Sequence, residues 1–148
     1  GTSYTAAVAD GVATFTTAAL AAGDNAYTIS YTTDAQIVGF TQSGTLVVNK
    51  ANVTSVTNNV AKAPTKSATG SLKVTVTRPS ALVQATGSVQ VTLVKGSVTK
   101  TLTATLVNGV ATFVLPKLPA GAWTIRSSYL GDANYNSNTP SVTSLKVK

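Results

Sequence analysis

The sequence predicts an all-β fold, an antiparallel sandwich of two sheets, and three observations predict it. Several stretches alternate apolar and polar side chains, such as L-K-V-T-V-T at 72–77 and V-Q-V-T-L at 89–93, which is typical of strands with one face in water. Thr and Val dominate these stretches, and their branched side chains favour strands over helices. Turns that contain glycine separate the stretches, and no helical periodicity interrupts them.

A repeat divides the chain into two parts. G-V-A-T-F at 11–15 recurs at 109–113, and the same offset of 98 residues aligns Gly23 with Gly121. Self-similarity at a fixed offset predicts repeated structural units. We therefore expect a complete copy in 51–148 and only the second half of a copy in 1–50.

The individual strands follow from the alternation and the turns. In the complete copy we expect seven, at about 53–58, 70–78, 87–94, 98–106, 110–114, 122–130 and 141–147. In 1–50 the offset predicts counterparts of the last four, at about 2–8, 11–15, 26–32 and 44–48. The three opening strands have no counterpart. Four side chains should consequently be uncovered: Phe15, Leu20, Ile29 and Tyr31.

Three motifs of the complete copy carry a family likeness. They are N-G-V-A-T-F at 108–113, L-P-A-G-A-W-T-I at 118–125 and Y-L-G-D-A-N-Y at 129–135. Together they resemble the bacterial immunoglobulin-like (Big-type) repeat of large surface-exposed proteins. In 1–50 the likeness is partial, because Y-x-G-D has become Y-T-T-D at 31–34. The resemblance implies an immunoglobulin-like β-sandwich that serves as a spacer or adhesive stalk outside the cell.

The composition argues against an enzyme. The chain has no Cys, Met, His or Glu, so four Asp residues are its only acids. Thiol nucleophiles, His-dependent triads, zinc sites of His and Cys, and paired Glu residues are thereby excluded. We expect no catalytic residue, no cofactor and no metal site.

Two residues are weak binding candidates. Asp132, with Asn134, Asn136 and Asn138, could offer oxygens to calcium. That ion takes about six to eight oxygen ligands, however, so a single carboxylate favours an Asx turn instead. Trp123 could stack on a sugar as an exposed platform, whereas a place at the edge of the core is the favoured interpretation.

Charge differs between the two parts. All 11 basic residues lie at or after Lys50, where Asp132 is the single acid, so 50–148 carries +10 and 1–49 carries −3. The Lys residues stand singly, so we expect weak attraction to acidic cell-surface polymers but no nucleic-acid binding. No apolar run reaches the roughly 18–20 residues of a membrane span. Residues 1–4 do not begin a signal peptide, as in a mature or excised fragment of an exported chain.

These observations predict a non-enzymatic extracellular module, namely a spacer, stalk or assembly unit of a bacterial surface protein or filament. Its expected partners are neighbouring immunoglobulin-like domains of the same or adjacent chains, including a homo-oligomer through strand edges or head-to-tail contacts. Two alternatives stay open: a decoration or tail domain of a phage virion, and a carbohydrate-binding module appended to a secreted enzyme. The half copy indicates either a chain cut from a longer one or a neighbour that supplies the remaining strands.

Overall fold

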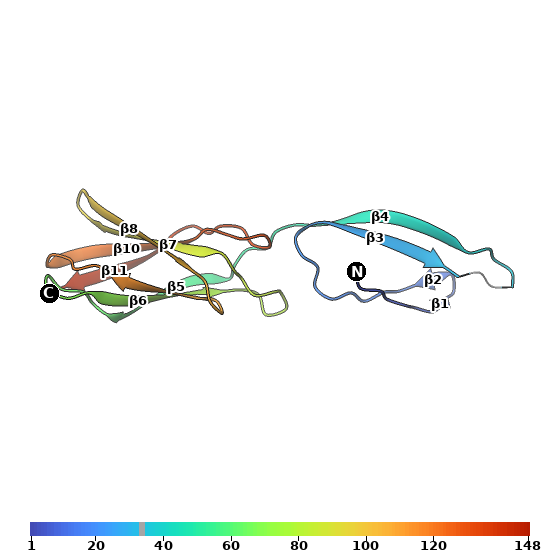
Figure 1. The fold of residues 1–148 in the computed structure, drawn as a ribbon, viewed down its shortest axis with the longest axis horizontal. Helices are drawn as coiled ribbons and strands as arrows, with labels where there is room; N and C mark the ends of the chain where they lie inside the picture. Colours follow the sequence, from blue (N-terminus) through green and yellow to red (C-terminus); the bar gives the residue numbers. More distant parts are fainter. Residues whose placement is uncertain (33–34) are drawn as a thin grey trace. The chain divides into compact units, whose positions relative to one another are not determined.

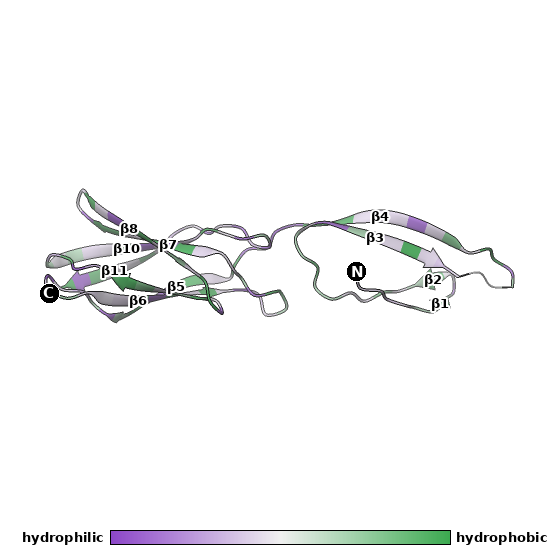
Figure 2. Cartoon of the chain, in the orientation of Figure 1, coloured by the Kyte–Doolittle hydropathy of each residue, from purple (hydrophilic) through white to green (hydrophobic). Residues whose placement is uncertain are grey.

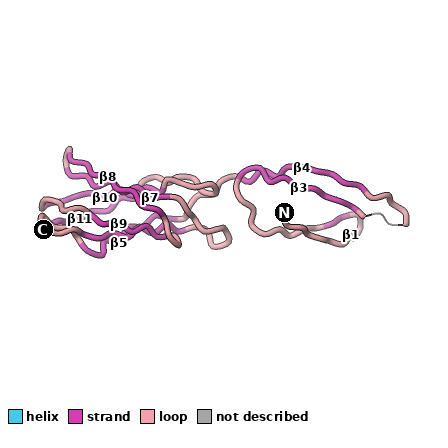
Figure 3. The backbone as a smooth tube through the Cα atoms, in the orientation of Figure 1, coloured by secondary structure: helices cyan, strands magenta, loops and turns pink. Residues whose placement is uncertain are grey.

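The computed structural model describes residues 1–32 and 35–148, which form strands and loops (Figure 1, Figure 3). No helix occurs among these residues, so the all-β prediction is confirmed. A helix that could cross a membrane is accordingly absent from the described part of the chain. The chain divides into two compact units, Gly1–Val48 and Asn49–Lys148, here called the first and the second unit.

The second unit is built from two antiparallel sheets. One has the strand order β5-β6-β9 and the other the order β11-β10-β7-β8. The strands are β5 (Ser55–Lys62), β6 (Gly70–Thr77), β7 (Ser88–Lys95), β8 (Val98–Thr105), β9 (Val110–Leu115), β10 (Gly121–Tyr129) and β11 (Ser141–Val147). Each expected stretch coincides with one of these strands, with ends displaced by a few residues.

The core of the second unit lies between its two sheets. Along β6, Leu72 and Val74 are buried while Lys73 between them is exposed, as the alternation requires. Along β10, every second side chain points inward, and these inward residues are fully or nearly fully buried: Trp123, Ile125, Ser127 and Tyr129. Burial of each large apolar side chain contributes roughly 1.5–3 kcal/mol to the stability of the sandwich.

The first unit consists of two separate hairpins within its described residues. β1 (Val8–Ala9) pairs with β2 (Val12–Ala13), and β3 (Gly23–Tyr31) pairs with β4 (Phe40–Val48). Apolar and polar residues are mixed along β3 and β4 (Figure 2). Two expectations are corrected here: in the stretch 2–8 only Val8 lies in a strand, β1, and the strand expected at 11–15 is reduced to β2. The aspartate of Y-T-T-D, Asp34, lies outside the described residues.

The offset of 98 residues recurs in the backbone geometry. β3 and β10 begin and end at equivalent positions. Asp10 and Asn108, which are equivalent, both have φ near +50°, an uncommon value for residues other than glycine. The glycines that follow them, Gly11 and Gly109, have φ values of 78° and 77°. The same tight turn is therefore formed in both units.

The pairing of the second unit explains which strands the first unit forms. β8 pairs only with β7, and β9 pairs only with β6. Neither β6 nor β7 has a counterpart in the first unit. Residues 1–7 accordingly form no strand, and β2 has only two residues. β3 keeps one neighbour, β4, because β4 is the counterpart of β11. A strand needs a neighbour that accepts and donates its backbone hydrogen bonds.

Candidate functional site

The motif at 129–135 forms a turn that closes around the carboxylate of Asp132. Its Oδ1 atom accepts hydrogen bonds from the backbone N–H groups of Asn134 at 2.7 Å and Tyr135 at 2.8 Å. Its Oδ2 atom accepts from the backbone N–H of Thr86 at 2.7 Å and from the Thr86 hydroxyl at 2.9 Å. Asp132 therefore ties the loop after β10 to the residues that open β7.

These hydrogen bonds also set the ionisation of the turn. Burial acts to raise the pKa of Asp132, but the hydrogen bonds donated by Thr86 and Asn134 outweigh it and lower this pKa from 3.8 to about 2. Burial, together with the nearby Asp132 carboxylate, raises the pKa of the Tyr129 hydroxyl above its usual value. At neutral pH the carboxylate is thus an anion held by neutral donors.

Two of the asparagines that could have joined Asp132 in a cation site make side-chain hydrogen bonds within the protein. Asn136 Nδ2 donates to Asn52 Oδ1 at 3.0 Å, and Asn138 Oδ1 accepts from the backbone N–H of Tyr129 at 2.6 Å. Among the described residues, no group of three or more His, Cys, Asp or Glu side chains could hold a metal ion. The arrangement is that of an Asx turn, which stabilises the loop through its own carboxylate.

The same turn holds the beginning of the second unit. Ala51 forms a parallel bridge with Tyr135, in which Ala51 N–H donates to Asn134 O and Asn136 N–H donates to Ala51 O, both at 2.9 Å. Lys50 Nζ donates to the backbone carbonyl of Asp132 at 2.6 Å. The segment that follows β4 is therefore fastened to the loop after β10. We call this arrangement, residues 50–52 with 83–87 and 131–136, the turn node.

One glycine and one tyrosine allow the turn node to close. The Tyr135 hydroxyl donates to the backbone carbonyl of Val83 at 2.6 Å, and the ring is buried. Gly87 has a φ of 77°, and a Cβ atom there would lie 2.6 Å from the carbonyl oxygen of Gly131. Glycine at position 87 permits both the left-handed backbone and the close approach of the two loops.

Trp123 is a core residue. Its side chain is 2% exposed, and its Nε1 atom donates to the carbonyl of Pro119 at 3.0 Å. Lys95 Nζ lies 6.0 Å from the ring centroid and also donates to the carbonyl of Ala120. The ring therefore has no open face on which a sugar could stack, and the ligand-contact role considered for it is replaced by packing. Lys95 covers one side of the ring.

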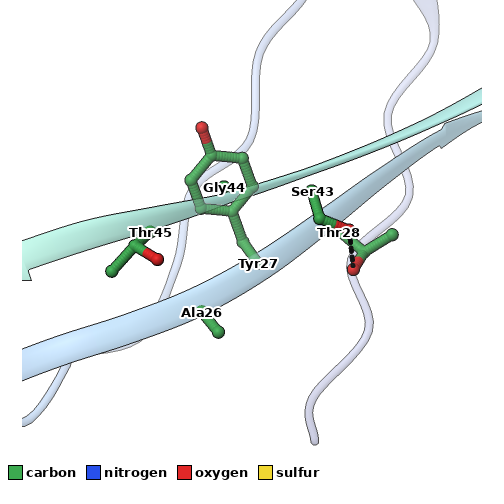
Figure 4. A pocket seen from close by; sticks show the side chains of 6 residues that line it. All are labelled: Ala26, Tyr27, Thr28, Ser43, Gly44 and Thr45. Carbon is green, nitrogen blue, oxygen red and sulfur yellow. Dashed lines mark hydrogen bonds between the residues drawn. The ribbon is translucent and has the colours of Figure 1, made fainter.

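The first unit has a shallow hollow on β3 and β4. It measures about 430 Å³ and is lined by Ala26, Tyr27, Thr28, Ser43, Gly44 and Thr45. The Tyr27 ring lies across Gly44 of the paired strand (Figure 4), where an added Cβ would be 2.5 Å from the Tyr27 hydroxyl oxygen. An aromatic ring laid over a glycine covers backbone that would otherwise be bare. The hollow is thus a by-product of strand packing.

One face of the β3–β4 hairpin is apolar and uncovered. We call it the open face, and its residues are Tyr27, Ile29, Tyr31, Phe40 and Leu46. Tyr31, which the sequence predicts to be uncovered, is half-buried. Ile29 is 44% exposed and Phe40 is 55% exposed. Tyr31 stacks on Phe40 with their ring centroids 6.0 Å apart. Outside the hairpin, Phe15 and Leu20 are exposed as well, as the sequence predicts.

The equivalent face of the second unit is covered. Ile125 of β10 is fully buried, and Leu145 of β11 is 5% exposed. In that unit the sheet formed by β5, β6 and β9 packs over these side chains and contributes Val56, Leu72, Val74, Ala111 and Phe113 to the core. In contrast, no described side chain of the first unit is fully buried.

A family model described as "Bacterial Ig-like domain (group 3)" matches residues 41–148. The chain belongs to this family. Among solved structures, the bacterial Ig-like chain is similar to the rat CD45 extracellular region, domains d3-d4, at 12% identity and a TM-score of 0.46, covering 99% of this chain and 76% of that one. No curated protein matches the chain.

Sequence reasoning missed part of the turn node of this bacterial Ig-like chain. Thr86 and Val83 were not assigned as partners of Asp132 and Tyr135. The threonine that precedes a turn glycine, at positions 86 and 87, is visible in the sequence. The partners, however, lie 46 and 52 residues apart, and the sheet order is needed to bring them together.

Proposed function

We propose that this bacterial Ig-like chain is a non-enzymatic structural module, which acts as a spacer, stalk or assembly unit of a protein exposed outside the cell. The observation that supports this most is the packed interior of the second unit. Its large side chains are buried between the sheets, and the one acidic side chain of the unit, Asp132, is engaged by internal hydrogen bonds. What the unit offers to other molecules is its ends and strand edges.

A spacer must keep its two ends at a fixed separation, so neither end of the unit should unfold locally. The beginning of the second unit is secured twice, by the parallel bridge between Ala51 and Tyr135 and by the pairing of β5 with β6. Its end is secured by β11, which pairs with β10 from Gly121↔Val147 to Ser127↔Ser141. Both ends of the second unit are therefore anchored to the same core, which is the property that a serial module requires.

Exchange of the module in the parent protein of the producing cell tests this function. The second unit would be replaced by an unrelated β-sandwich of similar length, and in a second strain it would be deleted. Exposure of a distal epitope is then measured on intact cells by antibody labelling and protease shaving. For a spacer, the exchanged strain should keep the epitope exposed, while the deleted strain should lose part of that exposure.

Two results would contradict the proposal. The first is an epitope that labels only after the cells are lysed, because the module would then not lie outside the cell. The second is a loss of function in the exchanged strain together with normal exposure of the epitope, because a specific ligand site would then reside in the module. The variant Lys100→Ala, on the exposed surface of β8, serves as the matched control.

A further inference from the structure

We propose that one end of the second unit binds a flexible linear polyanion through lysines that the fold gathers from distant parts of the sequence. We call this end the basic end, and its residues are Lys62, Lys66, Lys95, Lys117 and Lys146. It lies where β5, β7, β9 and β11 end and where β6, β8 and β10 begin, beside the mark C in Figure 1. The proposal goes beyond the spacer function and does not depend on it.

A hydrogen bond between two loops brings the first pair of lysines together. The loop between β5 and β6 is tied to the loop between β9 and β10 by the backbone N–H of Leu118, which donates to Thr65 O at 3.1 Å. Lys66 and Lys117 are the sequence neighbours of these two residues. The two lysines therefore lie on adjoining loops, although they are far apart in the sequence.

The strand ends beside these loops supply the other three lysines. Lys62 is the last residue of β5. Lys146 pairs with Ala122 near the start of β10. Lys95 Nζ donates to the carbonyl of Ala120, which belongs to the loop between β9 and β10. Of the five lysines, four are exposed and Lys95 is half-buried. Lysines that stand singly in the sequence thus form one group in the structure.

The second unit, which is described throughout, places no carboxylate side chain at the basic end. Asp132 is the single acid of 50–148, and it follows the opposite end of β10. The nine residues of that strand span ~30 Å. The Asp132 carboxylate is moreover engaged by Thr86 and by its own turn. Positive charges that gather without counter-charges raise the local concentration of anions.

The residue types indicate what kind of anion fits the basic end. All five cations are lysines, which act as mobile point charges, whereas arginine pairs in a fixed geometry and is the cation enriched in protein interfaces. The aromatic residues near this end, Trp123 and Phe113, are buried, so they offer no ring on which a nucleic-acid base could stack. A flexible chain of anionic groups needs neither fixed pairing nor stacking, and a chain of phosphates is its simplest form.

Binding of inorganic polyphosphate to the 148-residue chain tests the proposal, with poly-L-glutamate of equal charge in a second arm. Calorimetry at about 50 mM salt should detect binding, and the dissociation constant should rise at least ~10-fold by about 200 mM salt, because bound counterions are released. Binding of either polymer supports the proposal, and the tighter arm identifies the anionic group. Absence of binding in both arms at the lower salt concentration would overturn it.

Two double variants that remove the same charge assign the binding to the basic end. Lys66→Gln with Lys117→Gln should weaken polyphosphate binding at least ~5-fold and make its salt dependence shallower. Lys95 is left unaltered because it contacts Trp123.

The matched control is Lys73→Gln with Arg126→Gln, whose exposed side chains lie within β6 and β10. It should weaken binding less than ~2-fold, since these two cations lie away from the basic end. Equal losses in both double variants would overturn the proposal, because the attraction would then follow the net charge alone.

A measurement on the unaltered chain maps the site without any variant. Polyphosphate should shift the backbone amide NMR signals of residues 62–69 and 116–120 and leave those of the turn node unchanged. Shifts centred on the turn node would overturn the proposal.

Two other partners are separated by further outcomes. Single-stranded DNA that binds at least ~10-fold more tightly than polyphosphate of equal charge would indicate contacts to bases and would overturn the proposal. A salt-sensitive oligomer of the unaltered chain that Lys66→Gln with Lys117→Gln dissociates would also overturn it. In that case the acidic first unit of a second copy would occupy the basic end.

Discussion

Asp132 and Thr86, which are 46 residues apart, are joined by two hydrogen bonds to one carboxylate oxygen, from the Thr86 backbone N–H at 2.7 Å and from its hydroxyl at 2.9 Å. This pair connects the loop after β10 with the start of β7. Hydrogen bonds to a charged acceptor are about twice as strong as those between neutral groups. The pair is thus a main stabilising contact of the turn node.

Asp132→Asn should destabilise the second unit by about 1–3 kcal/mol, because an amide replaces the anion and has one acceptor oxygen for four donors. Thr86→Val removes only the hydroxyl and should cost about 1 kcal/mol. Urea unfolding followed by Trp123 fluorescence measures both. Equal stability of Asp132→Asn and the unaltered chain would show that the turn node contributes nothing.

Stability should also fall in acid in a defined range. The pKa of Asp132 is lowered to about 2 in the folded state, against 3.8 in an ordinary aspartate. Its contribution is therefore fully present above pH 3.8 and is lost as the pH falls toward about 2. Unfolding midpoints measured from pH 5 to pH 2 should decline for the unaltered chain. In Asp132→Asn this decline should be much smaller, and an equal decline in both proteins would assign it to other groups.

The strand pattern of the second unit could be predicted from the sequence because alternation directly reports which side chains face the core. Leu72 and Val74, the first apolar residues of the alternation at 72–77, are fully buried as that pattern predicts. The first unit shows where such reasoning ends. Residues 2–8 have strand-like composition, yet they form almost no strand, because the β7 counterpart that would pair with them is absent.

The role of Lys95 could not be predicted from the sequence for a related reason. Its position at the end of β7 suggests a solvated side chain, but β7 lies beside β10, which brings Lys95 over Trp123. Contacts between residues that are distant in the chain require the sheet order, which alternation does not contain. For the same reason the partners of Asp132 became visible only in the structure.

Core substitutions should lower the stability of the second unit much more than surface substitutions do. Phe113→Ala and Ile125→Ala remove buried side chains and should each destabilise the second unit by roughly 2–5 kcal/mol. Lys100→Ala, on an exposed side chain, should change stability by less than about 0.5 kcal/mol. Lys95→Ala should cost more than Lys100→Ala, because Lys95 contacts Trp123 and the carbonyl of Ala120. Thermal unfolding measures the order, and a loss in Lys100→Ala as large as in Phe113→Ala would contradict the assignment of faces.

Two glycines form a matched pair for testing the close approach at the turn node. Gly87 and Gly96 both have positive φ, but an added Cβ meets the Gly131 carbonyl oxygen at 2.6 Å in the first case and nothing within 4 Å in the second. Gly96→Ala should cost about 1–2 kcal/mol, from backbone strain alone. Gly87→Ala should cost about 3 kcal/mol or more, since overpacking adds to the strain. Equal unfolding free energies for the two variants would contradict the claim that the Gly131 carbonyl leaves no room for a side chain at position 87.

The central claim is that the first unit repeats the second half of the sandwich and lacks the strands that cover it. Residue-resolved amide hydrogen exchange on the 148-residue chain tests this most directly. In residues 124–127 of β10, which are paired with both β11 and β7, consecutive amides should all be protected. In β3, which is paired with β4 alone, alternate amides should exchange quickly. Uniform protection along β3 in a monomeric chain, equal to that of β10, would contradict the claim.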